Sequence, residues 1–590
     1  MLVLASQGKI DIDDGELERL VRDKTNLLNP LLAEQMTIDQ ALIKAKNLGY
    51  FKDYEVPEVQ DRPIITEIPT TDEQWQTLFP PRTKADMSVR RSRLQDWQPL
   101  MDISWLNKLR NLDYITVANL TIAREIHGPV LEHIFTTMGM LSSLEHYIRG
   151  ANSLNQIAKK YPLAIDDRLL LAELGNLTGY RQMPMPGFDI YKEASALAHG
   201  GEPHGLQETE WDGVFNTAAR EVMRGQVIPP VEFLTLEEYI RQDLASTSGS
   251  STIGKMHYNW EENKGKFKAR KNMVMDLFTA EEVIALVKKN YTKQTATAFV
   301  KPELGKLRVA VTGDIEAYYV SSWLNYLCGH CYTSWDGNTL EESATQQLKR
   351  MERTLDALIK AFSLPFDYKG FDHQPTLTEI KILLREYLAS ALRNVPPEYQ
   401  EEVRTVIDDV VESFSETVMI IRDGDKTWQI KVTGGVQSGV RLTSLLGNMW
   451  NQTMTVISER LCELTDVLIM KLIRGDDSSL ISRNYAGCLL ARLGYQAINA
   501  QGHDAKYGIH YQETEFLRIW YANDRVYGYP NRAIPSLVQR KPWTSDPWGS
   551  EAVVISQLET IKLIERRVGR PQKTILDLII NSWQRKRGLS

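Results

Sequence analysis

Residues 466–482 read DVLIMKLIRGDDSSLIS, which places two short apolar stretches on either side of the acidic turn Arg474-Gly-Asp-Asp477. Short runs of apolar and β-branched residues bounded by turn residues are typical of β-strands. Gly475 permits a sharp bend between the two runs, because glycine adopts backbone angles that other residues avoid. The sequence therefore predicts a β-hairpin that presents Asp476 and Asp477 at its turn.

A second acidic cluster, Asp367-Tyr-Lys-Gly-Phe-Asp372, follows the short extended segment Leu364–Phe366. Phosphoryl transfer with two metal ions needs at least two carboxylates close together, and hard cations such as Mg²⁺ prefer oxygen ligands. Either cluster alone is weak evidence. A Gly-Asp-Asp tripeptide occurs by chance in roughly one chain in ten of this length, so a solvated turn is the plainer interpretation of that cluster by itself.

A glycine-rich segment, Gly434-Gly-Val-Gln-Ser-Gly-Val-Arg-Leu-Thr443, lies between the clusters and precedes a helix predicted to end at about Leu461. Backbone N–H groups in such a loop suit contact with a nucleotide or a template strand. The alternative is an ordinary helix N-terminus capped by Ser438. The order of the three segments favours a shared site.

The surrounding chain alternates between helices and strand pairs. Helical patterns cover residues 340–363, 376–394 and 398–414, and a hairpin pattern covers 418–432. We therefore expect an antiparallel sheet backed by helices, which is the α+β class.

Composition limits the possible functions. The chain has 590 residues, of which 43% are apolar and 25% charged, so wholesale disorder, collagen and a simple coiled coil are excluded. Its 69 Lys and Arg against 76 Asp and Glu give a net charge of −7, which argues against a uniformly basic RNA-coating surface. An enzyme that gathers its basic residues in a channel remains possible.

Cysteine content and apolar runs indicate where such a protein works. Four cysteines are too few for a disulfide scaffold and suggest a reducing compartment. Cys328-Gly-His-Cys331 has a metal-like spacing but lacks a second ligand pair. No apolar run approaches the roughly 20 residues that span a bilayer, and residues 1–30 contain no apolar core of the signal-peptide type. We expect a soluble intracellular protein without a membrane partner.

The three segments together resemble motifs A, B and C of the viral RNA-dependent RNA polymerase palm. Ser438 lies 71 residues after Asp367, and Asp476 lies 38 residues after Ser438, spacings that suit that family. KPELGKLR at 301–308 is similar to the basic finger motif F, Lys506 to the motif D lysine, and Glu515–Arg518 to motif E. The pattern SGxRxT is most similar to polymerases of double-stranded RNA viruses of the picobirnavirus, cystovirus, partitivirus and totivirus kind.

The resemblance implies the roles of the acidic residues and of the glycine-rich loop. Asp367 and Asp476 would bind two catalytic Mg²⁺ ions, for which Mn²⁺ can substitute, with Asp477 assisting. Asp372 would accept a hydrogen bond from the ribose 2′-OH, which is a physical way to prefer ribonucleotides. The other nucleotide-binding residues of the loop would be Ser438, Gly439 and Thr443.

The resemblance also implies roles for basic residues. Lys306 and Arg308 would hold the incoming triphosphate, with Lys301 a weaker member of the group. Lys506 would act as general acid toward the leaving pyrophosphate. The residues expected to contact RNA are Arg518 and, in the basic run 264–271, Lys266, Lys268, Arg270 and Lys271. A solvated charged face is the alternative for that run.

One departure from the family concerns motif B. Many members carry an Asn four residues after the motif B Thr, whereas this chain has Gly447 there and Asn448 one residue later. One residue on a helix is a rotation of about 100°. Asn448 is therefore not expected among the nucleotide ligands.

The implied fold is a closed right hand with an encircled active site. The N-terminal arm, 1–95, would bridge fingers and thumb. The fingers would occupy 96–360 and 377–429, the palm 361–376 and 430–520, and the thumb with the C-terminal tail 521–590.

The implied activity is RNA-directed RNA polymerisation that replicates and transcribes a viral, double-stranded RNA genome. Expected partners are template and product RNA, NTPs and an inner capsid protein, and the enzyme is expected to be monomeric. Its expected location is the viral core particle or the host cytoplasm. A reverse transcriptase would carry aromatic residues in place of Asp372 and Gly475. A non-catalytic RNA-packaging or capsid-associated protein is the other alternative, against which the intact acidic residues argue.

Overall fold

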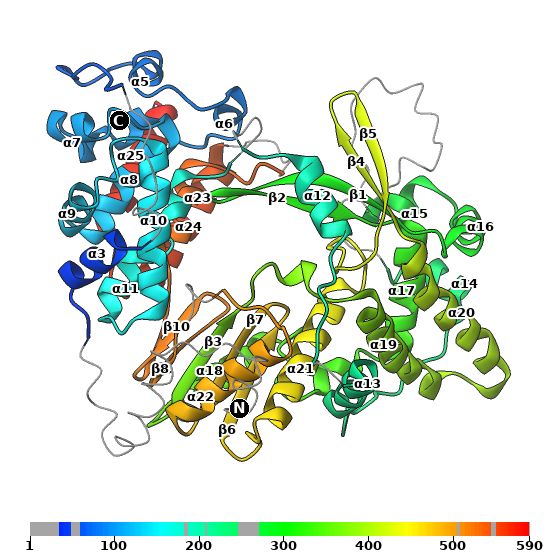
Figure 1. The fold of residues 1–590 in the computed structure, drawn as a ribbon. Coiled ribbons are helices and arrows are strands. Elements are labelled where there is room, and N and C mark those ends of the chain that lie inside the picture. Colours follow the sequence, from blue (N-terminus) through cyan, green and yellow to red (C-terminus); the bar gives the residue numbers. More distant parts are fainter. Residues whose placement is uncertain are drawn as a thin grey trace. The chain divides into compact units, whose positions relative to one another are not determined.

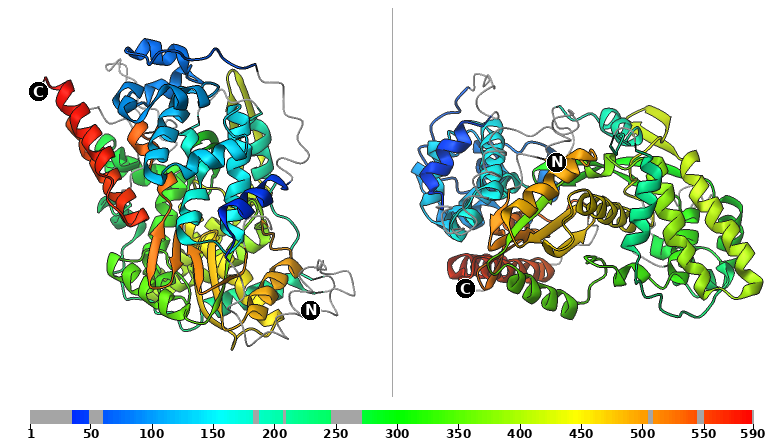
Figure 2. Two further views of the ribbon diagram at one scale, coloured as in Figure 1. Left: turned by 90° about the vertical axis from the view of Figure 1, so that its left-hand side faces the viewer. Right: turned by 60° about the horizontal axis from the view of Figure 1, so that its bottom comes forward.

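The computed structural model describes residues 35–48, 60–181, 187–206, 209–245, 271–503, 508–543 and 550–588. These residues divide into two units, whose elements are labelled in Figure 1 and seen from two further sides in Figure 2. Among the described residues, unit 1 comprises 189–300 and 309–503, and unit 2 comprises 35–188, 301–308 and 508–588.

An antiparallel sheet in unit 1 carries both acidic clusters. Three neighbouring strands of this sheet are β6 (Leu468–Arg474), β7 (Asp477–Ser482) and β3 (Phe362–Asp367), and β7 pairs with the other two. β7 is buried from its second residue to its end. Helix α22 (Tyr485–Ala497) packs against β3 and β7, so the sheet is backed by a helix as the sequence predicts (Figure 1).

Helix α21 (Thr443–Leu461) is almost entirely buried in unit 1. It packs against α13 (Trp211–Val222), α19 (Leu377–Leu388) and α22. Trp450 of α21 donates its indole N–H to the buried carboxylate of Glu379 on α19, at 2.9 Å. The elements around α21 therefore hold it rigidly beside the sheet.

Glu379 joins three segments of unit 1. Besides Trp450, Trp211 donates to this carboxylate at 2.9 Å and His204 lies 3.1 Å from it. Burial raises the pKa of Glu379, but these hydrogen bonds and the charge of His204 outweigh burial and leave the pKa below its usual value. A charged Glu379 is thus the favoured form in the folded protein.

A second sheet, most of whose residues belong to unit 1, has the strand order β2–β1–β4–β5. It contains β1 (Thr295–Glu303), β2 (Lys306–Thr312), β4 (Val418–Asp423) and β5 (Lys426–Lys431), with β1 parallel to β4. α12 (Ile190–Ala198) packs on β4.

Several helices of unit 1 begin at clear sequence signals. Ser or Thr before a helix, followed three residues later by Gln or Glu, forms reciprocal capping bonds at α16, α18 and α19. The helices of unit 1 not yet given bounds are α14 (Leu236–Arg241), α15 (Val274–Leu277), α16 (Ala280–Asn290), α17 (Ile315–Leu327), α18 (Ala344–Ala357) and α20 (Gln400–Ser413).

Unit 2 is mainly helical. Its helices are α3 (Ile38–Lys46), α5 (Asp72–Leu78), α6 (Lys84–Ser88), α7 (Ile103–Lys108), α8 (Tyr114–His127), α9 (Val130–Thr137), α10 (Leu144–Lys160), α11 (Ile165–Leu171), α23 (Pro535–Val538), α24 (Ser550–Val568) and α25 (Lys573–Lys586). Its short strands are β8 (His510–Tyr511), β9 (Glu513–Phe516), β10 (Ile519–Ala522) and β11 (Arg525–Gly528).

One hydrophobic core joins distant parts of the chain in unit 2. Trp75 and Phe79, near the N-terminal end of the described residues, share this core with Ile534 and Ile561. Residues of the expected N-terminal arm therefore contribute buried side chains, while 1–34 and 49–59 of that arm lie outside the described residues. Within the described part of the chain, no helix combines the length and the apolar character that a membrane crossing requires.

Candidate catalytic site

The two acidic clusters meet in the sheet of unit 1. In the antiparallel β3–β7 ladder, Asp367 lies directly opposite Asp477. Arg474 and Asp477 close the β6–β7 hairpin, so Gly475 and Asp476 form its two-residue turn. Asp367 and Asp477 are half-buried, and Asp476 is exposed. The predicted hairpin and the predicted approach of the acidic segments are both found.

Gly475 is required by backbone conformation rather than by space. Its φ is +60°, and a Cβ atom built on it would meet no atom within 4 Å. A two-residue hairpin turn with a positive φ at its first position, but not at Asp476, fits a type II′ turn.

Two asparagines of α21 hold this turn. The backbone N–H of Gly475 donates to Asn448 Oδ1 at 3.0 Å, and Asn451 Nδ2 donates to the Gly475 carbonyl at 2.8 Å. Asn448 was not expected at the site from its position in the motif, and no motif pointed to Asn451. Their spacing of three residues, which places both on one helix face, was the available signal.

Gly447 explains why the motif B asparagine is displaced. A Cβ atom at Gly447 would lie 3.1 Å from the ring of Phe371, which is the residue before Asp372. A larger side chain at this position would press on the motif A loop. In this chain the position favours close packing of Phe371 on α21, and Asn448 instead contacts the acidic turn.

The loop that carries Asp372 is bonded to the glycine-rich loop. Asp372 lies in the 3₁₀ turn Phe371–His373, and its carbonyl accepts a hydrogen bond from the Val436 N–H at 2.7 Å. The Gly435 N–H donates to the Pro375 carbonyl at 2.9 Å. These backbone bonds fix the two loops against each other, which brings two of the expected nucleotide-binding segments together.

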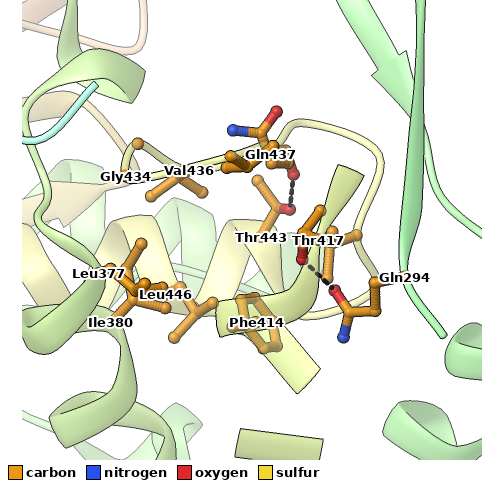
Figure 3. Close-up of a pocket in the computed structure, with 13 residues that line it drawn as sticks. Gln294, Leu377, Ile380, Phe414, Thr417, Gly434, Val436, Gln437, Thr443 and Leu446 are labelled. Carbon is orange, nitrogen blue, oxygen red and sulfur yellow. Dashed lines mark hydrogen bonds between the residues drawn. The ribbon is translucent and has the colours of Figure 1, made fainter. Parts of the chain in front are cut away.

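The hydroxyl groups of Ser438 and Thr443, in the glycine-rich loop, form hydrogen bonds with backbone groups of the protein. Ser438 Oγ accepts a hydrogen bond from the Val311 N–H at 3.0 Å, and Thr443 Oγ1 donates to the Gln437 carbonyl (Figure 3). A Cβ atom at Gly439 would lie only 1.9 Å from the Val311 carbonyl oxygen. The loop therefore packs on β2 in a way that only glycine at 439 allows.

Gln437 is a further feature of this loop. Both polar atoms of its side-chain amide are buried, and neither has a hydrogen-bond partner among the described residues. The loop and the start of α21 border a small pocket lined by apolar side chains that include Ile380, Phe414 and Leu446 (Figure 3). An unpaired buried amide destabilises the fold by roughly 1–3 kcal/mol for each unmet group.

The expected triphosphate-binding residues surround Glu303 in unit 2. Lys301, Lys306 and Arg308 lie 3.7, 3.8 and 3.3 Å from its carboxylate oxygens. All three side chains are at least one-third exposed. This role of Glu303 was not predicted from the sequence, although the residue lies within the same KPELGKLR segment.

Arg518 occupies the turn between β9 and β10. Leu517 and Arg518 have φ values of +53° and +60°, which non-glycine residues rarely adopt. The Arg518 guanidinium donates to Glu173 at 2.8 Å, and Lys159 lies 3.6 Å from the same carboxylate. Burial raises the pKa of Glu173, but Lys159, Arg518 and Arg532 lower it more, to about 2.

Of the four predicted residues in the basic run, only Lys271 lies among the described residues. Its ammonium group lies 4.2 Å from the centre of the Tyr318 ring, a cation–π contact. Burial, and then the charge of Arg441, lower the pKa of Lys271. The predicted site residues outside the described part of the chain are Lys266, Lys268, Arg270 and Lys506.

The acidic residues fit a divalent cation by their chemistry and by their backbone positions. Asp367, Asp476 and Asp477 offer carboxylate oxygens, which Mg²⁺ and Mn²⁺ prefer. Across the described ranges, no three His, Cys, Asp or Glu side chains are already gathered as a metal-binding group.

Comparison with known proteins gives one family. Residues 296–541 match the sequence profile described as viral RNA-directed RNA-polymerase. The chain is 25% identical, over 380 residues, to the probable RNA-directed RNA polymerase of Giardia lamblia virus (isolate Wang). The alignment covers 58% of this chain and 19% of that protein, so the chain spans about a fifth of its relative's length.

Two solved structures are also similar. The RNA-dependent RNA polymerase of a human picorbirnavirus aligns with a TM-score of 0.47 and 12% identity, over 87% of this chain and 92% of that one. Its insertion loop deletion mutant aligns with a TM-score of 0.46 and 14% identity, over 78% and 84%. The family that the motifs resemble is thus also the one whose profile matches residues 296–541 of this chain.

Proposed function

We propose that this chain is an RNA-directed RNA polymerase that joins ribonucleotides on an RNA template. The observation that carries the proposal is the pairing of Asp367 with Asp477, with Asp476 in the adjoining turn. This pairing lies inside the segment that matches the polymerase family. The reaction is attack of a 3′-OH on the α-phosphate of an NTP, with release of pyrophosphate.

In this proposal, Asp367 and Asp476 hold two Mg²⁺ ions, or Mn²⁺ in their place, and Asp477 assists. When bound, such ions stabilise the attacking and the leaving oxygen of a phosphoryl transfer. The chain's own contribution is to fix the carboxylates at the end of a buried sheet. Rigid support of this kind lowers the reorganisation needed in the reaction.

Sugar selection is assigned to Asp372 and Ser438. The Ser438 oxygen accepts the Val311 N–H, so its own hydroxyl proton remains able to donate. The Thr443 proton is already donated to Gln437, which makes Thr443 a support of the loop. Gly439 allows the loop to lie close to β2. Asp372 accepts a hydrogen bond from the ribose 2′-OH of the NTP.

Lys306 and Arg308, with Lys301 in a weaker role, are assigned to the triphosphate. Exposed ion pairs contribute only about 0–1 kcal/mol, so a triphosphate with several negative charges can replace Glu303. Until then, Glu303 keeps the three cations together. Lys506 is assigned as general acid, and Arg518 and residues of the basic run as RNA contacts.

The remaining parts of the proposal are the right-hand subdomains with a closed site, and a monomeric enzyme of a double-stranded RNA virus. The enzyme would replicate and transcribe the genome inside the viral particle or in the host cytoplasm, next to an inner capsid protein. A reverse transcriptase is disfavoured because Asp372 and Gly475 stand where aromatic residues would be expected.

A template-dependent incorporation assay tests this function. The full chain is incubated with a single-stranded RNA template, labelled NTPs, and Mg²⁺ or Mn²⁺. We expect labelled RNA complementary to the template, and much less product with dNTPs. Absence of product with both ions, on primed and unprimed templates, contradicts the proposal. A preference for dNTPs supports the reverse transcriptase instead.

A further inference from the structure

We infer that Asn448 and Asn451 are positioning residues that set the acidic turn for metal binding; the inference rests on the proposed function. The two side chains bind both polar groups of one backbone residue. Asn448 accepts from the Gly475 N–H at 3.0 Å, and Asn451 donates to the Gly475 carbonyl at 2.8 Å. These two bonds, here named the amide clamp, restrain the turn immediately before Asp476.

The amide clamp is itself held in one conformation. Asn448 and Asn451 are fully buried. Asn448 Nδ2 donates to Gln452 at 2.8 Å and to Asn338 at 2.9 Å. Buried polar networks with every group satisfied are rigid and specific, whereas partial loss leaves unpaired groups.

A third bond extends the amide clamp to the other acidic cluster. The phenol of Tyr368, the residue after Asp367, donates to Asn451 Oδ1 at 2.9 Å. A phenol keeps its proton at neutral pH, so Tyr368 can donate this bond.

The consequence is that one face of α21 is bonded to both acidic clusters. Asn451 contacts the residue after Asp367 and the residue before Asp476. The helix thereby sets the separation of these two carboxylates. Because like charges repel when no cation is present, a free turn would move away from β3, and the amide clamp opposes this movement.

Mg²⁺ binding depends on accurate placement of the carboxylate ligands. The ion demands nearly ideal octahedral geometry, and functional groups must be held within about 0.5 Å of their working positions. Gly475 has no side chain, so its backbone N–H and carbonyl are the groups through which a neighbouring element can hold this position. The amide clamp holds both groups from a buried helix.

The plain alternative is that these bonds only pack α21 against the sheet. A packing role predicts lower stability and a smaller active fraction, with an unchanged metal requirement. A positioning role predicts a raised requirement for Mg²⁺, because loss of groups that orient metal ligands costs roughly 10–100-fold in metal affinity or activity. The two roles therefore differ in a measurable quantity.

The experiment uses the full chain with Asn448→Ala, Asn451→Ala or Tyr368→Phe. Tyr368→Phe removes only the hydroxyl and keeps the ring, so it remains informative if the asparagine variants fold poorly. Thr453→Val is the matched control, because Thr453 is fully buried in the same helix and its hydroxyl donates only to the Met449 carbonyl. Two quantities are measured: the Mg²⁺ concentration for half-maximal single-nucleotide incorporation, and Mn²⁺ binding by electron paramagnetic resonance, which needs no catalysis.

We expect the half-maximal Mg²⁺ concentration to rise about tenfold in the asparagine variants, and less in Tyr368→Phe. Mn²⁺ binding should weaken in the same order, RNA affinity should stay unchanged, and Thr453→Val should match wild type. An unchanged Mg²⁺ requirement in all three variants, or an equal rise in Thr453→Val, overturns the inference. If wild type incorporates no nucleotide, the proposed function fails, and the order of Mn²⁺ affinities still decides whether the amide clamp positions the ligands.

Discussion

Asp367 faces Asp477 across the β3–β7 ladder, so two carboxylates occupy directly opposed positions on one face of a sheet. Opposed residues in an antiparallel pair have Cβ atoms about 4.5–5.5 Å apart, and like charges there destabilise the sheet. A slip of one residue would send one of the two side chains to the other face. The register thus holds two like charges opposite each other. A bound cation would offset the repulsion between the two carboxylates.

The first prediction concerns the stability cost of this pair. Asp477→Asn removes one charge and keeps the shape, so the variant should unfold at a higher temperature than wild type in EDTA. The expected gain is about 0.2–1 kcal/mol. Thermal unfolding followed by circular dichroism measures it. Added Mg²⁺ should raise the melting temperature of wild type more than that of the variant, and a less stable variant in EDTA would count against the charge-pair account.

The second prediction concerns sugar selection by Asp372. Removal of its carboxylate in Asp372→Ala leaves the 2′-OH without an acceptor, so KM for NTPs should rise and the NTP/dNTP preference should narrow. Sites built to pair a substrate hydroxyl discriminate strongly, because the wrong substrate leaves polar groups unpaired. Single-nucleotide incorporation with each sugar measures the ratio of kcat/KM. Gly213→Ala, in helix α13, serves as control, and an unaltered ratio in Asp372→Ala removes Asp372 from this role.

The third prediction separates two glycines that are needed for different reasons. Gly475 has space but a φ of +60°, whereas a Cβ at Gly439 would lie 1.9 Å from the Val311 carbonyl. Gly475→Ala should therefore cost about 1–2 kcal/mol, and Gly475→Asn less, because Asn tolerates this conformation.

Among these variants, Gly439→Ala should lower the melting temperature most, because the loop must move away from β2 to admit the methyl group. Gly213→Ala is the opposite control: it has no positive φ and nothing within 4 Å, so alanine should stabilise the helix by about 0.5–1 kcal/mol. Melting temperatures of the four variants give the order. Equal losses in Gly475→Ala and Gly475→Asn would contradict the conformational explanation.

The fourth prediction is a pH dependence set by Glu173. Its pKa is lowered from 4.5 to about 2 in the folded protein, so the stabilisation is complete above the unfolded value and is lost as pH falls from about 4.5 toward 2. The amount is on the order of 3 kcal/mol. Glu173→Gln should be less stable than wild type at pH 7 and should lose less stability on acidification.

Unfolding by urea between pH 7 and pH 3 measures this difference. Glu401→Gln, which changes an exposed carboxylate at the start of α20, should follow the wild-type pH profile. Parallel pH profiles for Glu173→Gln and wild type would show that the ion pairs with Lys159 and Arg518 contribute little.

Local patterns predicted much of the catalytic region. The apolar runs around Gly475 gave β6 and β7 within two residues, and the helix expected to end at about Leu461 is α21. The convergence of Asp367 with Asp476 and Asp477 followed from strand ends and from the order of the motifs. These features depend on short stretches of sequence, where periodicity and turn residues are informative.

Long-range partners could not be predicted in this way. Glu173 is 345 residues from Arg518, and Asn338 is 110 residues from Asn448. Such contacts depend on how the chain packs, which a local pattern does not record. Gly447 is a similar case, because the reason for its small size is the ring of Phe371 on another segment.

The most direct test of the central claim is single-turnover incorporation of one correct NTP by Asp476→Asn, with RNA affinity measured in parallel. The substitution keeps the size of the side chain and removes a charge that faces the proposed ions, so the account predicts a rate lower by at least about 10²–10³-fold with RNA affinity unchanged. Asp367→Asn should behave alike, and the double variant should be little worse than either, because residues that act as a unit are not additive. Incorporation by Asp476→Asn at close to the wild-type rate would contradict the claim that these carboxylates form the catalytic site.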